Sequence, residues 1–157
     1  MNRSGAAQPE LSGLQDSPLR GGRYALPLSK LHSVPYRGRL ALKVHRITTC
    51  EQLLAVAGSR TGRAELALLA RLEPGQLEDL VRRADMARVK GVGVVFSQML
   101  EELGIRDVAA LAACEPAQLH DRLRRLNKRE RLARRSPTPE EVAGWVTQAR
   151  ALPIVID

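Results

Sequence analysis

Apolar residues recur every three to four positions from about Leu28 onward, which is the spacing of amphipathic helices. Turn residues interrupt this pattern at intervals, and Pro74 stands where a proline opens a helix well. The pattern predicts helices over residues 36–44, 49–57, 64–70, from 74 onward, 94–103, 108–113, 116–127 and from 138 to about 152. We therefore expect an all-α fold.

Capping residues sharpen several of these boundaries. Thr48 with Glu51, and Thr138 with Glu141, have the spacing of a capping box at a helix start. Gly104 is placed to end a helix in the left-handed conformation. Residues 1–27 lack periodicity, so we expect a mobile leader there, a domain over 28–152 and an extended tail over 153–157.

The sequence contains an internal repeat. At an offset of 58 positions, apolar residues from 34 to 53 superpose on those from 92 to 111. At an offset of 42, the Glu-Pro-x-Gln-Leu-x-Asp run from Glu73 matches the one from Glu115. The difference of 16 predicts an insertion between Leu54 and Arg71. We expect two related helical units packed together as one compact domain.

The chain is basic, with a formal net charge of +8, and its aromatic content is only 3%. Residues 28–90 hold most of this excess, with 12 basic and 6 acidic residues. An excess of arginine fits an anionic partner, and it fits an arginine-rich coding bias equally well. The low aromatic content argues against single-strand binding by base stacking.

Other classes of protein find no support in the sequence. It has neither a run of about 18 apolar residues nor a secretory signal, so we expect no membrane contact. Cys50 and Cys114 stand far apart on apolar positions and the histidines are scattered, so we expect no metal site, and buried thiols in a cytoplasmic protein. Without a catalytic constellation or a Walker loop, we expect no enzyme activity and no cofactor.

The segment from Arg88 to Gly93 carries the clearest chemistry. Gly91-Val92-Gly93 between two helices is the helix-hairpin-helix pattern, in which glycines permit positive φ and Val92 plugs the core. The amides that open the next helix then form an anion site for a backbone phosphate, with Lys90 and Arg88 beside it. The alternative is a tight turn that only joins two helices.

In the first repeat the equivalent turn is Ser33-Val34-Pro35, and Pro35 has no amide donor. The anion site there therefore lacks one backbone N–H donor, although Arg37 and Arg39 could contribute side-chain contacts. Duplex DNA is usually bound by two hairpins. This chain is predicted to have one intact hairpin and a second, weaker one.

Two further segments are candidates for anion contact. Arg124, Lys128 and Arg131 lie on one helical face, which continues to Arg135 if the helix does; the alternative is a solvated face balanced by nearby acids. The second segment is a turn with hydroxyls, a glycine and an arginine, which would bind an anion or simply cap a helix. Its candidate residues are Ser59, Thr61, Gly62 and Arg63.

The chain contains several motif blocks in order. They are Thr48-Thr49-x-Glu51-x-Leu53-Leu54, Gly62-Arg63-x-Glu65-Leu66-Ala67, Arg83 to Gly93, and Val142-x-x-Trp145-Val146-x-x-Ala149, together with Asn127, Arg134, Arg135 and Pro137. These blocks resemble one family, the bacterial domain of unknown function 4332. The resemblance covers about Lys30 to Leu152 and implies a tandem helix-hairpin-helix-like domain. It leaves the activity open, and Ser33-Val34-Pro35 departs from a glycine-containing first hairpin.

Taken together, the residues favour a non-enzymatic module that contacts nucleic-acid backbone, such as that of double-stranded DNA, without sequence specificity. The alternative is a protein–protein interaction adaptor for an acidic partner, with the hairpin purely structural. Trp145 has helical spacing with apolar neighbours and is expected in the core.

Overall fold

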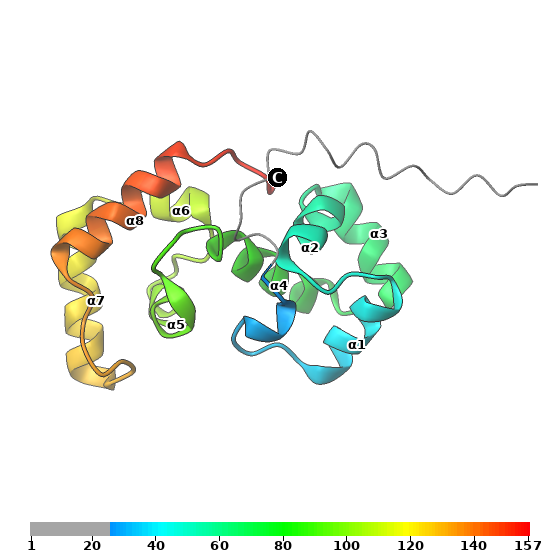
Figure 1. Cartoon of the computed structure of the whole chain (residues 1–157), viewed down its shortest axis with the longest axis horizontal. Helices are drawn as coiled ribbons and strands as arrows, with labels where there is room; N and C mark the ends of the chain where they lie inside the picture. Colours follow the sequence, from blue (N-terminus) through cyan, green and yellow to red (C-terminus); the bar gives the residue numbers. More distant parts are fainter. Residues whose placement is uncertain (1–25) are drawn as a thin grey trace, which may run out of the picture.

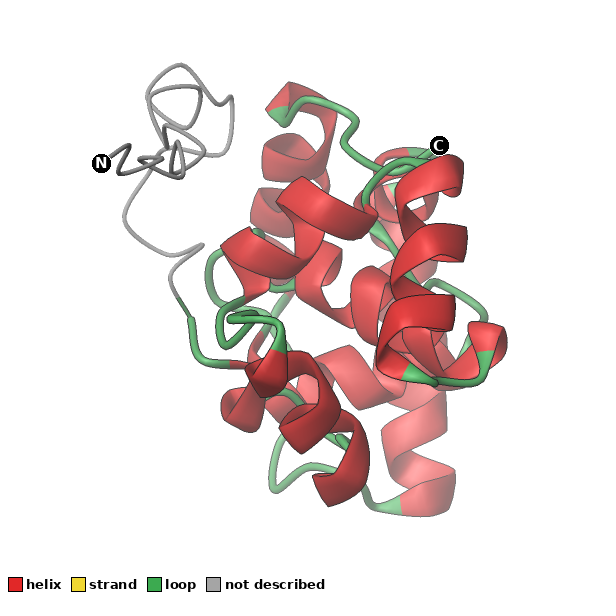
Figure 2. Cartoon of the chain, turned by 90° about the vertical axis from the view of Figure 1, so that its right-hand side faces the viewer, coloured by secondary structure: helices red, strands yellow, loops and turns green. Residues whose placement is uncertain are grey.

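The computed structural model describes residues 26–157, so the predicted mobile leader lies almost wholly outside the described residues. Within the described part there are eight α-helices, one 3-10 helix and no strand, which confirms the all-α class (Figure 2). The elements are η2 (Leu28–Lys30), α1 (Tyr36–Val44), α2 (Cys50–Ala57), α3 (Arg60–Ala70), α4 (Pro74–Met86), α5 (Gly93–Glu102), α6 (Val108–Ala112), α7 (Pro116–Glu130) and α8 (Pro139–Ala151).

The helices form two groups that share α4. In Figure 1, α1–α3 lie at one end of the molecule, α5–α8 lie at the other, and α4 runs between them. Each group has its own apolar core: Leu42, Leu53 and Leu80 belong to the first, and Leu100 and Trp145 to the second. The side chains of α4 divide between these cores, so this helix joins the two halves.

Helix positions follow the offsets of the sequence repeat. α2 and α6 begin 58 residues apart, and α4 and α7 begin 42 apart. Arg46 (φ 61°) and Gly104 (φ 81°) occupy equivalent left-handed positions. The next residue in each case, Ile47 or Ile105, donates its N–H to the carbonyl five residues earlier, at 3.0 and 2.9 Å. The predicted insertion is α3.

Two local predictions need correction. The first capping box is formed by Thr49 and Gln52, not by Thr48 and Glu51, because Thr49 has the extended backbone of an N-cap and α2 begins at Cys50. Helix α3 begins at Arg60, earlier than predicted, because the Ser59 side chain caps it. The capping box at Thr138, the left-handed Gly104 and the core position of Trp145 are confirmed.

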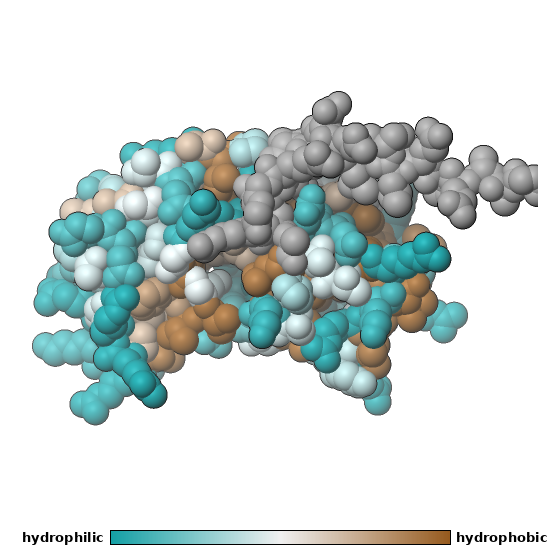
Figure 3. Space-filling model, viewed as in Figure 1, coloured by the Kyte–Doolittle hydropathy of each residue, from teal (hydrophilic) through white to brown (hydrophobic). Residues whose placement is uncertain are grey.

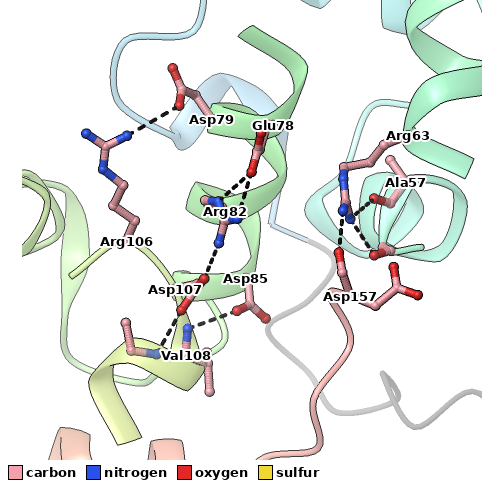
Figure 4. Close-up of polar contacts among 12 residues, drawn as sticks. Ala57, Arg63, Glu78, Asp79, Arg82, Asp85, Arg106, Asp107, Val108 and Asp157 are labelled. Atoms are coloured by element: carbon pink, nitrogen blue, oxygen red, sulfur yellow. Dashed lines mark hydrogen bonds and ion pairs between the residues drawn. The ribbon is translucent and has the colours of Figure 1, made fainter. Parts of the chain in front are cut away.

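Polar contacts tie the two halves together (Figure 4). Arg82 on α4 pairs with both Glu78 and Asp107, and the buried Asp85 accepts from the Val108 N–H at 2.9 Å. The tail after α8 returns to the first half, where the Asp157 N–H donates to the Gly58 carbonyl at 3.1 Å. The tail therefore spans both halves, although the sequence presented it only as an extended end.

Candidate functional site

The turn before α5 has the backbone that the sequence predicted. Gly91 (φ 90°) and Gly93 (φ 65°) both adopt the left-handed region that favours glycine, and both are exposed. Val92 between them is only 2% exposed and belongs to the second core. The turn is therefore anchored by one side chain and presents its glycine backbone to solvent.

Helix α8 is hydrogen-bonded to the start of this turn. The Lys90 N–H donates to Gln148 Oε1 at 2.8 Å, and Gln148 Nε2 donates to the Lys90 carbonyl at 3.1 Å. A Cβ built on Gly91 would lie 3.3 Å from Trp145 Nε1, so a larger residue would crowd the indole. Gln148 was not predicted from the sequence, and its position one helical turn after Trp145 is the signal that marks it.

The first amides of α5 lack a capping side chain. Among the other described α-helices, α2, α3, α6, α7 and α8 each have an N-cap side chain that accepts from a first-turn amide, whereas α1 and α4, like α5, have none. At α5 the N-cap is Val92, which offers no acceptor, and Val94 in the first turn is exposed. Uncapped amides at the positive end of a helix dipole attract an anion, and the exposed Lys90 lies next to them.

Arg88 is buried and does not lie on the surface beside the turn. Its side chain is 1% exposed; Nη1 donates to Asp85 Oδ1 at 2.7 Å and Nη2 to the Pro153 carbonyl at 2.6 Å. Burial raises the pKa of the Asp85 carboxyl, while the N–H of Val108 and the Arg88 guanidinium oppose that shift. The prediction that Arg88 contacts phosphate is therefore wrong, because the chain after α4 turns this side chain inward against Asp85.

The equivalent turn in the first half shares part of this geometry. Ser33 (φ 54°) has the left-handed backbone of Gly91, whereas Pro35 (φ −61°) differs from Gly93. Helix α1 also starts without a side-chain cap. Arg37 is exposed, while Arg39 is half-buried with its guanidinium carbon 5.5 Å from the centroid of the Tyr36 ring.

The basic run is less available than the sequence indicated. Helix α7 ends at Glu130 and Arg131 (φ 50°) is left-handed, so the predicted face ends at Lys128. Arg124 pairs with Asp121, and so does Arg125. Hydrophilic side chains project from this end of the molecule in Figure 3, yet acidic neighbours neutralise part of the arginine charge.

The predicted anion turn is occupied by the chain itself. Ser59 Oγ accepts from the Gly62 N–H at 3.0 Å, and the N–H of Arg60 donates to the Asp157 side-chain carboxylate. Arg63 donates to the Gly58 carbonyl at 2.6 Å and to the Asp157 main-chain oxygen (Figure 4). Thr61 is exposed in the first turn of α3. The turn thus caps a helix and receives an internal carboxylate.

The remaining predictions concern cysteines, metals and membranes. Cys50 is 1% exposed, as expected, but Cys114 is only half-buried, with its Sγ 3.3 Å from the Ala110 carbonyl. No group of three or more His, Cys, Asp or Glu able to hold a metal ion lies among residues 26–157. None of the described helices is both long and apolar enough to span a bilayer.

Comparison with known families identifies one match, to the family described as Domain of unknown function (DUF4332). The match extends over residues 36–152, from the start of α1 to the end of α8. The chain belongs to this family. No curated protein and no solved structure matches the chain. Membership agrees with the resemblance seen in the motif blocks and covers both α-helical halves.

Proposed function

We propose that this member of DUF4332 is a non-enzymatic, cytoplasmic module of helix-hairpin-helix type that binds nucleic-acid backbone without sequence specificity. The observation that carries the proposal is the turn from Lys90 to Gly93. Two exposed left-handed glycines lead into a helix whose first amides have no side-chain cap, and a lysine stands beside them. Backbone amides and one cation are the groups that hold a phosphate without reading a base.

Additional support comes from the surroundings of the turn. Gln148 is hydrogen-bonded to both main-chain polar groups of Lys90, and the Val92 side chain is buried in the core. These contacts hold the turn in place before a ligand arrives, which reduces the entropy lost on binding. Arg37 and the uncapped start of α1 would supply the second, weaker contact, since Pro35 lacks an amide proton.

The test is fluorescence anisotropy with a short labelled duplex of arbitrary sequence, at about 50 and 200 mM salt. Lys90→Glu should weaken binding about tenfold and lower the salt slope by about one. Lys128→Glu makes the same charge change on exposed α7 and should have a much smaller effect. Absence of binding at low salt, or equal losses in both variants, contradicts a specific role for the turn.

A second function has one specific observation in its favour. Helix α1 exposes Tyr36, Leu40 and Val44, which are 65%, 41% and 79% exposed, at the i, i+4, i+8 spacing of a single helical face. The exposed Arg37 and Lys43 lie on the same helix. A basic helix with an apolar stripe fits an acidic protein partner.

This adaptor function predicts that a protein partner survives nuclease treatment in a pull-down with the intact chain. Leu40→Asp should release it, since the change places a charge in the centre of the apolar stripe. Retention of the same protein by the Leu40→Asp variant would exclude the stripe as its binding surface.

A further inference from the structure

A cavity of about 600 Å³ lies between the segment that opens the described chain and the α4–α5 turn. One wall comes from Lys30, Leu31 and His32, and the opposite wall includes Gly91 and Val94. In Figure 1 the η2 segment lies between α1 and α5. The volume of the cavity falls in the range of small-molecule sites, about 300–1,000 Å³.

The walls are mostly apolar, with cationic groups at a few points. Leu31, Met86, Val89 and Val94 supply hydrocarbon surface, whereas Lys30, His32 and Arg83 supply nitrogen. No carboxylate belongs to the wall among residues 26–157. A site with this lining would accept a ligand that has a hydrocarbon body and a polar head.

Hydrogen bonds determine which cation remains available. Glu101 Oε1 lies 2.8 Å from Arg83 Nε and 3.1 Å from His32 Nε2, so this carboxylate, behind the wall, balances one charge. Arg83 Nη1 donates to the Ser33 carbonyl at 3.3 Å. Burial lowers the pKa of His32, which disfavours the charged ring, while the neighbouring Glu101 opposes that shift. Among residues 26–157, the exposed Lys30 ammonium is thus the cation in excess at the cavity.

We propose that this cavity binds a small amphiphilic carboxylate, with its hydrocarbon chain between η2 and α5 and its carboxylate on Lys30. Charge complementarity selects an anionic head over a cationic one, because the described residues around the cavity carry a net positive charge with Glu101 included. The apolar walls select a hydrocarbon chain over a sugar or nucleoside, since few hydrogen-bonding groups would satisfy a polar body. The proposal does not depend on nucleic-acid binding.

The experiment is isothermal titration calorimetry of the full chain with decanoate. Decanol and decyltrimethylammonium serve as probes with the same chain and a neutral or cationic head. We expect one decanoate per chain, at least tenfold weaker binding of the other two, and about tenfold weaker decanoate binding by Lys30→Gln. Because burial of a hydrocarbon chain can release almost no heat at one temperature, the titration is run at two temperatures. No heat with decanoate at either temperature, or equal affinity for the three probes, overturns the proposal.

A second variant locates the ligand. Ser97→Phe fills the cavity from α5 and should abolish decanoate binding, whereas Thr147→Phe on the exposed face of α8 is the matched control and should leave it unchanged. Far-UV circular dichroism checks that both variants remain folded. If Ser97→Phe does not fold, Ala87→Phe fills the same cavity from the end of α4. Unchanged binding in a folded cavity-filling variant places decanoate elsewhere and overturns the proposal.

Discussion

Replacing Arg88 by leucine should destabilise the domain strongly without any direct effect on ligand binding. The Arg88 guanidinium is 1% exposed and donates to the buried carboxylate of Asp85 at 2.7 Å and to the Pro153 carbonyl at 2.6 Å. Arg88→Leu leaves the Asp85 carboxylate without its charge partner in the interior. Breaking a buried pair in this way costs about 3–5 kcal/mol, out of about 5–15 kcal/mol for a domain of this kind.

Urea unfolding measures this loss, and Trp145, the sole tryptophan and 2% exposed, is the fluorescent probe. Arg106→Leu is the matched control because it removes a 3.9 Å pair with Asp79 that is exposed on both sides. The control should change the free energy of unfolding by less than about 0.5 kcal/mol. If Arg88→Leu costs no more than the control, Arg88 does not join α4 to the tail as the geometry implies.

Cys50, Glu141 and Gly58 each allow a further test. Burial raises the pKa of the Cys50 thiol to about 12. Iodoacetamide at pH 8 should therefore label the half-buried Cys114 first, and equal labelling of the two cysteines would contradict the burial of Cys50. The hydrogen bond from Arg135 lowers the pKa of Glu141 from 4.5 to about 2. The stabilisation from this pair is therefore present above about pH 4.5 and is lost as the pH falls toward 2. Glu141→Gln should flatten the loss of folded protein at acid pH, measured by circular dichroism, and an unchanged loss would count against the pair. A Cβ on Gly58 would overlap a main-chain oxygen of the tail, so Gly58→Ala should lower Tm while Gly75→Ala, in open space, should not.

The helix order was predictable because apolar spacing and caps are local signals. Thr138 and Glu141 form the capping box that their spacing indicated, and Gly104 has the left-handed backbone that ends α5. The turn at Gly91 and Gly93 was predictable for the same reason, because two glycines around a buried valine are typical of a tight turn with positive φ.

Long-range contacts were not predictable from those signals. Arg88 and Asp85 stand three residues apart, which is also the spacing of an exposed helical pair, and only the packing of the tail buries them. The Ser59 turn resembled an anion site because its ligand, Asp157, is almost a hundred residues away. Arg131 adopts positive φ without being glycine, so nothing local marked the end of α7.

The proposed function depends on contact between the turn from Lys90 to Gly93 and a nucleic-acid backbone. A ¹⁵N–¹H NMR titration of the labelled chain with a short duplex at low salt tests it directly, because each amide reports for itself. We expect that the amides of Gly91, Val92, Gly93 and Val94 shift most, that the Arg37 amide shifts less, and that about 200 mM salt reverses the changes. Shifts confined to α7 and residues 131–138, or no shifts at all, would contradict it.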